Sequence, residues 1–485
     1  MKLKNLLDGV NVKEIIGDDN VEITDVRSDS YSVTKGCLYI CIKGLKCNGQ
    51  DYVRQAVKYG AKAVLSESPC DTFVTQIIVD NAIKEMIFIA ANYYGNAHKK
   101  LKIIGITGTN GKTTTSQIIK SIMDESGEKC AVIGTNGVFY GNKTVETGMT
   151  TPDPLVLHKL FADMVSDGIK YVVMEVSAHA LYFDKVEGIN FFIGVLTNLT
   201  QDHFDFFGNM EEYKKAKKKL FEKGRCKYIL ANSDDPFGQE LIKDENALSF
   251  GLNNPSDVFC INVKESLKKT EFVLNLFDQI YNVKINLIGE FNVYNVMAAA
   301  AVAALCGIKG DNVFKGIKKI KKVSGRMETV YDGDYKVIID YAHTPDGLGK
   351  ALRAVKSTCS NKVVCVFGCG GNRDDSKRKI MGKISGENAD FTVITSDNPR
   401  YEDPMAIIYE IEKGIIPVSK NYVLVSEREE AIKYAINYAK KGDVVLVCGK
   451  GCEKYQEKLG IKRLYNDKDT IMNVIGGKEF DKGID

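Results

Sequence analysis

The sequence feature that most constrains the fold is the segment 102–115, in which an apolar run leads into a glycine-containing loop and then into a lysine and three threonines. A strand, loop and helix in this order form a cradle for a polyphosphate, because Gly108 and Gly111 let the backbone come close and the loop N–H groups point at the phosphate oxygens. The strict Walker pattern fails, because Ile106 stands where its first glycine would be. The residues predicted to contact the nucleotide are Gly108, Thr109, Asn110, Gly111, Lys112, Thr113 and Thr114.

The length and composition limit the class of protein. A chain of 485 residues with 44% apolar and 27% charged residues exceeds one hydrophobic core, and three domains are expected. The net charge of +3 provides no general basic surface, so no nucleic-acid partner is expected. Acidic residues begin at Asp8, and the chain has neither a signal-like apolar core nor a run of about 18 apolar residues. We therefore expect a cytoplasmic protein without a membrane partner, whose thirteen cysteines are mostly buried thiols.

Strand-like and helix-like patterns alternate along most of the chain, which predicts an α/β fold with parallel sheets and covering helices. Residues 1–97 contain short strands and one helical pattern at 52–59, and are predicted to form a small N-terminal α/β domain. In 98–325, five strand-like runs with intervening helices predict a central P-loop-like ATPase domain, which a polar interval and an alanine-rich helix at 296–305 complete. The alternation restarts in 326–485, which predicts a C-terminal Rossmann-like domain.

Two polar residues follow buried strands of the predicted central sheet. Glu175 ends the apolar run that begins at residue 171, and His203 comes after the next strand. Ligands bind at the carboxyl ends of the strands in such sheets, and a buried carboxylate needs a cation. We therefore predict that Thr113, Glu175 and His203 are Mg²⁺ ligands. The five lysines of the helical pattern that follows would by pattern alone be a solvated face.

Two of these strings resemble a known family. The string TGTNGKTT at 107–114 resembles the signature of the Mur ligase family, which also includes folylpolyglutamate synthases. The run DHFDFFGNMEEYKKAK at 202–217 is similar to a family segment whose helix contains a carbamylated lysine. The resemblance implies that Lys217 is carbamylated and binds Mg²⁺ together with His203. A lysine that is kept uncharged can combine with CO₂, which turns a cation into a carboxylate.

The N-terminal and central segments contain strings that resemble the family's contacts to a UDP-linked muramoyl dipeptide. Residues 29–31 with 36–44 resemble its uridine-binding pattern, although Tyr31 replaces the usual arginine and Gln50 the usual histidine. TTPD at 150–153 resembles the dipeptide-binding motif, and Phe183 stands where a glutamine is common. The resemblance implies that the UDP-substrate residues are Ser30, Thr150, Thr151, Ser177 and Lys185.

Three further motifs resemble the family's downstream contacts to the nucleotide: FNVYN at 291–295, GRME at 325–328 and DYAHTPD at 340–346. Singly each could be an ordinary hydrogen-bonding segment, but three matches in order favour one ligand. They imply that ATP lies between the second and third domains. The implied contacts are Asn295, Arg326, Asp340 and His343.

The string DNPR at 397–400 distinguishes between branches of the family. It resembles the motif of the branch that adds meso-diaminopimelate, whose distal carboxylate a guanidinium such as that of Arg400 can pair with bidentately. The distal ammonium group of lysine would be repelled there. Glu453 in GKGCE suits an ammonium group, and Cys452 replaces the usual histidine. The implied amino-acid residues are Arg373, Asp397, Asn398, Pro399, Arg400, Gly449 and Glu453.

The resemblance therefore implies a monomeric ATP- and Mg²⁺-dependent ligase that joins meso-diaminopimelate to UDP-N-acetylmuramoyl-L-alanyl-D-glutamate through an acyl phosphate. One alternative within the class is addition of L-lysine or action on another Mur-type substrate. An alternative from a different class is a binding or regulatory protein that hydrolyses ATP without ligation. Dependence of ATP turnover on both the UDP-substrate and an amino acid would discriminate between them.

Overall fold

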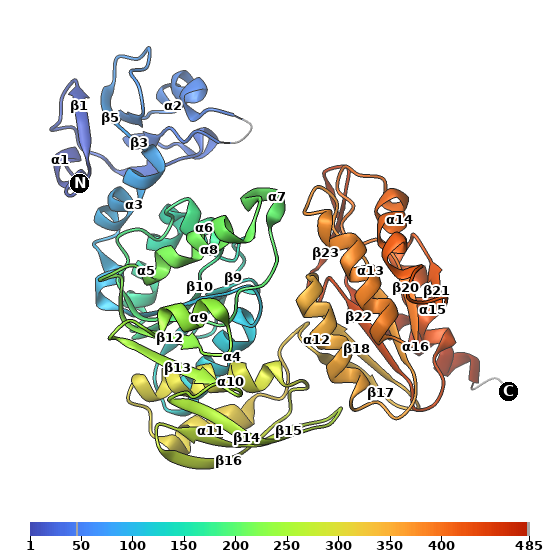
Figure 1. The fold of residues 1–485 in the computed structure, drawn as a ribbon. Helices are drawn as coiled ribbons and strands as arrows, with labels where there is room; N and C mark the ends of the chain where they lie inside the picture. The colour runs from blue at the N-terminus through green and yellow to red at the C-terminus, as the bar shows by residue number, and fades with distance from the viewer. Residues whose placement is uncertain (45–46, 483–485) are drawn as a thin grey trace. The chain divides into compact units, whose positions relative to one another are not determined.

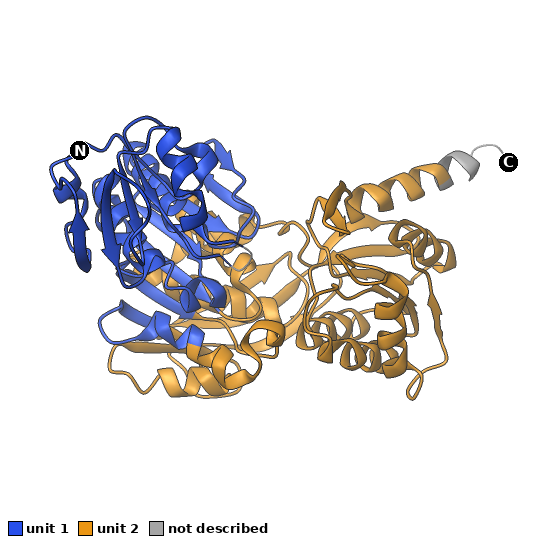
Figure 2. Ribbon diagram, turned by 90° about the horizontal axis from the view of Figure 1, so that it is seen from above, with its two compact units in different colours: residues 1–107, 127–195, 216–229 blue, residues 108–126, 196–215, 230–485 orange. Residues whose placement is uncertain are grey.

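The computed structural model describes residues 1–44 and 47–482 and has the predicted α/β fold, with mixed sheets and covering helices (Figure 1). The chain divides into two compact units, which Figure 2 shows in different colours. Unit 1 comprises residues 1–107, 127–195 and 216–229, and unit 2 comprises residues 108–126, 196–215 and 230–485. The predicted domain boundaries at 97 and 325 stay a prediction.

The first part of unit 1 is a five-stranded sheet of order β1-β5-β4-β3-β2, in which β1 is antiparallel to β5 and the remaining pairs are parallel. Leu38 and Ile40 face the side covered by α1 and α3, while Cys37 and Tyr39 face the side covered by α2. This alternation follows from the two-residue period of a strand. The predicted pattern at 52–59 is α2, whereas the longer helix α3 was not predicted. The elements are α1 (Leu3–Leu6), β1 (Val12–Ile16), β2 (Asp25–Arg27), η1 (Ser30–Ser32), β3 (Cys37–Ile40), η2 (Gly49–Tyr52), α2 (Val53–Lys58), β4 (Ala63–Ser66), β5 (Thr75–Val79), α3 (Ala82–Tyr93) and η3 (Ala97–Lys100).

The remainder of unit 1 contains neighbouring strands in the order β11-β6-β10-β7-β8-β9. β10 pairs in parallel with both β6 and β7, and β8 and β9 extend the sheet as an antiparallel ribbon. The buried strand β10 ends at Glu175, as the sequence predicted. The elements are β6 (Lys102–Thr107), β7 (Cys130–Gly134), β8 (Gly137–Tyr140), β9 (Lys143–Val145), α5 (Pro154–Ser166), β10 (Tyr171–Glu175), α6 (Ala178–Tyr182), β11 (Phe191–Leu196), η4 (Lys219–Phe221), and the first part of β12 (Cys226–Asn232).

The first part of unit 2 contains the phosphate-loop helix α4 and strands in the order β16-β15-β14-β13-β12. The almost fully buried alanine-rich helix α10 packs against α4. The interval before α10 is not an irregular polar stretch, because β14, β15 and β16 form antiparallel pairs there. The elements are α4 (Lys112–Glu125), α7 (Phe204–Phe207), α8 (Met210–Lys218, which continues into unit 1), α9 (Pro236–Leu241), β13 (Ala247–Gly251), β14 (Val258–Glu265), β15 (Thr270–Leu276), β16 (Gln279–Ile285), α10 (Phe291–Leu305) and α11 (Gly310–Lys319).

The C-terminal part of unit 2 is a six-stranded sheet of order β17-β18-β22-β19-β20-β21, parallel apart from the edge strand β17. Ile338 belongs to the core beneath α12, α13 and α14, and its neighbours Val337 and Ile339 to the core beneath α15 and α16. Helices thus cover both faces, as in a doubly wound fold. The elements are β17 (Glu328–Asp332), β18 (Lys336–Asp340), α12 (Pro345–Lys356), β19 (Val363–Phe367), α13 (Ser376–Asn388), β20 (Phe391–Ile394), α14 (Pro404–Ile415), β21 (Tyr422–Leu424), α15 (Arg428–Tyr438), β22 (Val444–Cys448), β23 (Tyr455–Lys458), β24 (Ile461–Leu464) and α16 (Asp467–Lys482).

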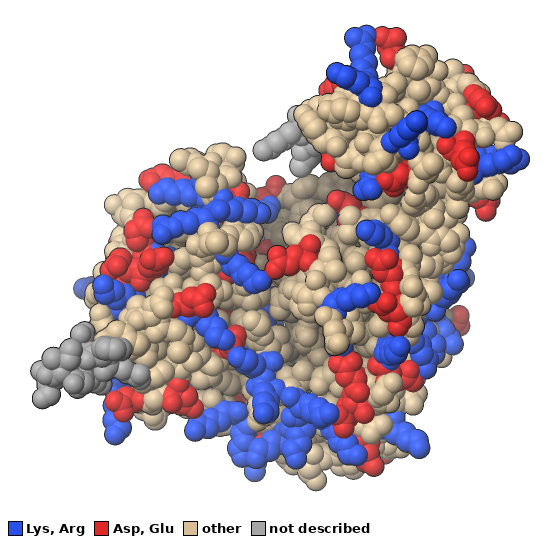
Figure 3. Space-filling view, turned by 180° about the vertical axis from the view of Figure 1, so that it is seen from behind, with Lys and Arg blue, Asp and Glu red and all other residues tan. Residues whose placement is uncertain are grey.

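The surface charge and the helices bear on two expectations from the sequence, namely the absence of a general basic surface and the absence of a membrane-spanning segment. Over most of the face drawn in Figure 3, Lys and Arg side chains are interspersed with Asp and Glu, and a group of Lys and Arg side chains gathers at its lower edge. Among the described residues, no helix has the length and apolar character needed to cross a bilayer.

Candidate active site

The phosphate loop is held by the segment that follows strand β11. The Thr197 hydroxyl donates to the carbonyl of Asn110 at 2.6 Å, and the Asn198 side chain exchanges hydrogen bonds with the backbone of Asn110. Gly108 has φ +143°, and a Cβ atom there would lie 1.9 Å from Thr197 Oγ1. Only glycine fits this close approach, so the loop has the backbone geometry that the sequence predicted.

Lys112 and Thr113 open helix α4 beneath this loop. The Lys112 ammonium donates to the carbonyls of Gly108 and Thr109 at 2.7 and 3.0 Å, and so lies along the loop. The Thr113 hydroxyl accepts a hydrogen bond from Arg326 at 3.2 Å. Arg326, which comes from the GRME motif, therefore reaches the loop, and its predicted contact with the nucleotide stays a prediction.

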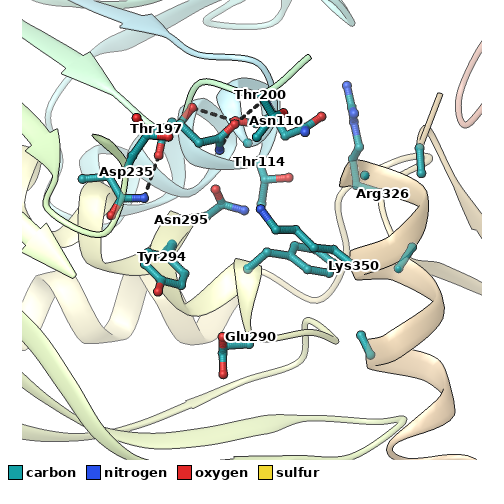
Figure 4. Close-up of a pocket in the computed structure, with 18 of the residues that line it drawn as sticks. Asn110, Thr114, Thr197, Thr200, Asp235, Glu290, Tyr294, Asn295, Arg326 and Lys350 are labelled. Atoms are coloured by element: carbon teal, nitrogen blue, oxygen red, sulfur yellow. Dashed lines mark hydrogen bonds between the residues drawn. The ribbon is translucent and has the colours of Figure 1, made fainter. Parts of the chain in front are cut away.

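A cavity of about 620 Å³ adjoins the loop within unit 2. Its wall comprises residues on both sides of the predicted boundary at 325, including Asn295 from α10 and Ala351 from α12. Figure 4 shows Lys350 reaching from α12 toward Thr114 and Asn295. The predicted nucleotide residues that line the cavity are Asn110, Gly111, Thr114, Asn295, Arg326 and Asp340.

Asp340 and Arg326 form the wall of the cavity that comes from the C-terminal part of the chain. Asp340 accepts hydrogen bonds from the backbone N–H groups of Met327 and Ala342, and Arg326 stacks on the Tyr341 ring at 4.3 Å. Burial raises the pKa of the Asp340 carboxyl, although Arg326 and both N–H groups oppose this shift. These contacts hold the backbone N–H that follows Arg326 and place the Arg326 guanidinium over the Tyr341 ring.

His343 does not line this cavity, unlike Asp340, the other predicted residue of the same motif. Its Nε2 lies 3.7 Å from the carboxylate of Asp202, and His203 Nε2 lies 3.3 Å from the same oxygen. Burial alone would raise the pKa of Asp202, but His343, His203 and Lys377 outweigh it and hold that pKa well below its ordinary value. Asp202, which the sequence analysis did not select, therefore joins two predicted site residues.

The predicted dipeptide residues lie together in unit 1. The Thr151 hydroxyl donates to the carbonyl of Glu175 and accepts from the N–H of Ser177. The Lys185 ammonium forms an ion pair with Asp153 at 2.6 Å, and so lies close to the TTPD motif. Ser30, in the same unit, is buried in η1, whereas the neighbouring Tyr31 is 74% exposed.

Glu175 and Thr150 approach the same hydroxyl in this cluster. The Thr135 side chain donates to the Glu175 carboxylate at 3.0 Å and lies 3.1 Å from Thr150 Oγ1. The Glu175 side chain is almost fully buried, and the backbone N–H of Thr135 also donates to it. The cluster therefore combines a buried carboxylate with hydroxyl groups, which are hard oxygen donors of the kind Mg²⁺ accepts.

Lys217 differs from its neighbours in helix α8. It is 1% exposed, whereas Lys215 and Lys218 on the same helix are exposed. A solvated face therefore accounts for some of the five lysines but not for Lys217. Burial disfavours the charged ammonium form, and an uncharged amine is the form that reacts with CO₂.

The predicted amino-acid residues meet at the end of strand β22. Asn398 donates to the Glu453 carboxylate at 3.0 Å, and Arg400 Nη1 donates to the Gly371 carbonyl at 2.7 Å. A Cβ atom at Gly449 would lie 2.5 Å from Asp397 Oδ2, so the GKGCE and DNPR loops are in close contact there. Arg373 instead lies 3.5 Å from Asp205.

The residues described here contain no group of three or more His, Cys, Asp or Glu side chains arranged to hold a metal ion. Mg²⁺ with a nucleotide takes most of its ligands from phosphate and water and needs only one or two protein carboxylates. The Glu175 carboxylate and the Thr113 hydroxyl are each oxygen donors of this kind, so the chemistry of each residue suits the ion.

Several cavity residues were not selected from the sequence. Thr197, Asn198 and Thr200 follow strand β11, and their position at the carboxyl end of a buried strand was the available signal. Lys350 and Tyr294 had no such signal, because a lysine or tyrosine within a helix is usually an ordinary surface residue. Figure 4 shows Thr197, Thr200, Tyr294 and Lys350 around the cavity.

The fold and these clusters agree with models of one family along most of the chain. The Mur ligase family, catalytic domain model matches residues 22–98, the Mur ligase middle domain model residues 106–303, and the Mur ligase, glutamate ligase domain model residues 325–451. The chain belongs to the Mur ligase family.

Relatives match over nearly the full chain. UDP-N-acetylmuramoyl-L-alanyl-D-glutamate–2,6-diaminopimelate ligase 1 of Clostridium acetobutylicum is 43% identical over 98% of both chains. The corresponding ligase of Bacillus cereus is 40% identical over 99% of both. A solved structure of a UDP-N-acetylmuramoyl-L-alanyl-D-glutamate–2,6-diaminopimelate ligase superimposes with a TM-score of 0.70 at 30% identity and covers 99% of each chain. The predicted fold class and the predicted enzyme class, a ligase, are confirmed.

Proposed function

We propose that this ligase joins meso-2,6-diaminopimelate to UDP-N-acetylmuramoyl-L-alanyl-D-glutamate with ATP, as a monomer in the cytoplasm. The relatives that match along the whole chain carry the name of this reaction. The product would be the UDP-linked tripeptide, together with ADP and phosphate. Addition of L-lysine is the alternative within the family.

The observation that carries the choice of amino acid is the pair of opposite charges beside Asn398. Arg400 belongs to the same loop as Asn398, and the Asn398 side chain is bonded to Glu453. The far end of diaminopimelate carries both a carboxylate and an ammonium group, which suit a guanidinium and a carboxylate respectively. Arg400 uses Nη1 for one hydrogen bond, and its Nε lies 3.5 Å from the Glu457 carboxylate. A guanidinium has five N–H donors, so further donors remain for a substrate carboxylate.

The chemistry follows from the poor reactivity of a carboxylate toward an amine. The D-glutamate carboxylate attacks the γ-phosphate of ATP, which gives an acyl phosphate and ADP. The amine of diaminopimelate then attacks the acyl carbon, and a tetrahedral intermediate expels phosphate. Lys112 and Arg326 are placed to offset the negative charge of the phosphates, because both reach the phosphate loop.

We propose Thr113, Glu175, His203 and carbamylated Lys217 as the protein ligands for Mg²⁺, following the family resemblance. The carbamate forms when the neutral amine of Lys217 adds to CO₂ and releases a proton. When bound, Mg²⁺ would neutralise charge on the phosphates and the reacting carboxylate. The buried carboxylate of Glu175 and the buried side chain of Lys217 support this assignment.

Replacing Arg400 by alanine is expected to raise the KM for meso-diaminopimelate on the order of 30-fold or more. Removing one partner of a desolvated charge pair costs about 2 to 5 kcal/mol, and about 1.4 kcal/mol corresponds to a factor of ten. L-lysine should lose nothing, because the variant removes a repulsion from its ammonium group. The measurement is kcat/KM for each amino acid at saturating ATP and UDP-dipeptide.

The control for this variant is Arg463→Ala, which removes an exposed arginine of β24 in the same part of the chain. It should leave both values of kcat/KM unchanged. If Arg400→Ala leaves the ratio between the two amino acids at its wild-type value, the assignment of Arg400 to the distal carboxylate is wrong.

A further inference from the structure

Lys450 is a fully buried lysine within the GKGCE motif, at 0% exposure. Its ammonium group donates to Asn398 Oδ1 at 2.9 Å, to Glu453 Oε2 at 3.0 Å and to the Tyr455 carbonyl at 2.8 Å. An ammonium group has three N–H donors, so these bonds use all of them. Lys450 therefore has no donor left for a substrate, and any role in binding must act through its partners.

Two of these partners are predicted amino-acid residues, and they are also bonded to each other. Asn398 Nδ2 donates to Glu453 Oε2, the same oxygen that accepts from Lys450. The side chains of Lys450, Asn398 and Glu453 thus close a ring of three hydrogen bonds. The ring fixes Glu453 Oε2 as the oxygen that faces Lys450 and Asn398. The orientation of the Asn398 amide is also fixed, because its Oδ1 accepts a second hydrogen bond from the N–H of Glu457.

Strand β23, which follows Lys450, holds the rest of the DNPR loop. The Gln456 side chain donates to the Asp397 carbonyl at 2.7 Å, and the N–H of Arg400 donates to the Glu457 carbonyl at 3.1 Å. Arg400 has φ +50°, which is unfavourable for a residue other than glycine. These bonds stabilise that conformation, and Lys450 anchors the start of the same strand through the carbonyl of Tyr455.

We propose that Lys450 is a positioning residue for the amino-acid substrate. It joins the DNPR loop, Glu453 and strand β23, and so sets the distance between the cation of Arg400 and the anion of Glu453 that a zwitterionic amino-acid end must match. The inference rests on the proposed function for its substrate. A displacement of about 1 Å in such a site can lower catalytic efficiency on the order of 100-fold. Loss of this anchor is therefore expected to weaken use of the amino acid although Lys450 itself does not contact it.

The test replaces Lys450 by methionine, whose side chain matches that of lysine in length as far as Cε but lacks the ammonium group, so the charge and all three donors are removed. The KM for meso-diaminopimelate should rise at least about 10-fold, while kcat at saturation stays within about 3-fold. The KM values for ATP and the UDP-dipeptide should stay at their wild-type values. Lys450→Gln, which retains an N–H₂ group, is the second variant and is measured in the same way if Lys450→Met yields too little folded protein.

The matched control is Arg428→Met, because Arg428 is a buried cation at the start of α15 whose bonds go to Asp467 and to the carbonyls of Cys448 and Ser396. It should lower the melting temperature without a specific rise in the KM for the amino acid. If Lys450 is merely structural, both Lys450 variants will resemble Arg428→Met, with reduced stability and unchanged KM, and this result would overturn the inference. Failure of the wild type to use diaminopimelate would instead contradict the proposed function, and the KM comparison would then use the amino acid that it accepts.

Discussion

Lys112→Ala is expected to lower kcat for ligation at least about 100-fold, because it removes a cation from the place where the phosphates of ATP gain charge during transfer. The Lys112 ammonium lies along the loop, bonded to the carbonyls of Gly108 and Thr109. Alanine retains the helix that Lys112 opens, since it has the highest helix propensity. The rate of ADP release with all substrates present is the measurement.

Binding of the UDP-dipeptide should stay nearly at its wild-type strength in the same variant, because all predicted residues for that substrate belong to unit 1 and Lys112 belongs to unit 2. Calorimetric titration measures this binding. The control is Lys120→Ala on the same helix. Lys120 forms an ion pair with Asp124, and loss of this pair is expected to leave kcat unchanged. If Lys112→Ala loses nucleotide turnover and UDP-dipeptide binding to the same extent, the assignment of the nucleotide and the UDP-dipeptide to separate sets of residues is wrong.

Lys217→Ala is expected to be nearly inactive if Lys217 carries the carbamate. The variant would remove a carboxylate ligand of Mg²⁺ from a buried position. No neighbouring lysine of α8 could replace it, because Lys215 and Lys218 are exposed and Lys214 forms an ion pair with Glu240. Acetate or formate at high concentration should partly restore turnover, because a small carboxylate can occupy the space that the side chain leaves. The measurement is turnover with increasing carboxylate concentration.

The matched control for this variant is Lys218→Ala, which removes the adjacent exposed lysine and should retain wild-type turnover without any response to carboxylates. A Lys217→Ala enzyme with full activity would show that burial of this lysine has no catalytic purpose. An inactive enzyme that no carboxylate restores would favour a packing role for Lys217 over a carbamate.

The sequence predicted the parts of the fold that local patterns determine. The phosphate loop needs glycines at close backbone approaches, and Gly108 and Gly111 lie in such places with positive φ. The doubly wound C-terminal part was predicted because its strands are continuous apolar runs, as expected for strands that are buried on both faces.

Other elements were not predicted because their signals are weak or depend on distant residues. Strand β15 alternates between buried and half-buried residues, but β14 and β16 carry many exposed polar residues and read as a polar interval. The burial of Lys217 among five lysines depends on tertiary packing, which the pattern of the helix does not contain. The ring of Lys450, Asn398 and Glu453 joins residues about fifty positions apart, so it also required the structure.

The central claim is that this chain is a ligase that adds meso-diaminopimelate, and phosphate release by the wild-type enzyme tests it most directly. The assay contains ATP and Mg²⁺ and omits in turn the UDP-dipeptide and the amino acid, with meso-diaminopimelate and L-lysine compared at equal concentrations. The account predicts phosphate release only when both substrates are present, a higher kcat/KM for meso-diaminopimelate, and a product with the mass of both substrates less one water. Release of phosphate without an amino acid, or a preference for L-lysine, would contradict it.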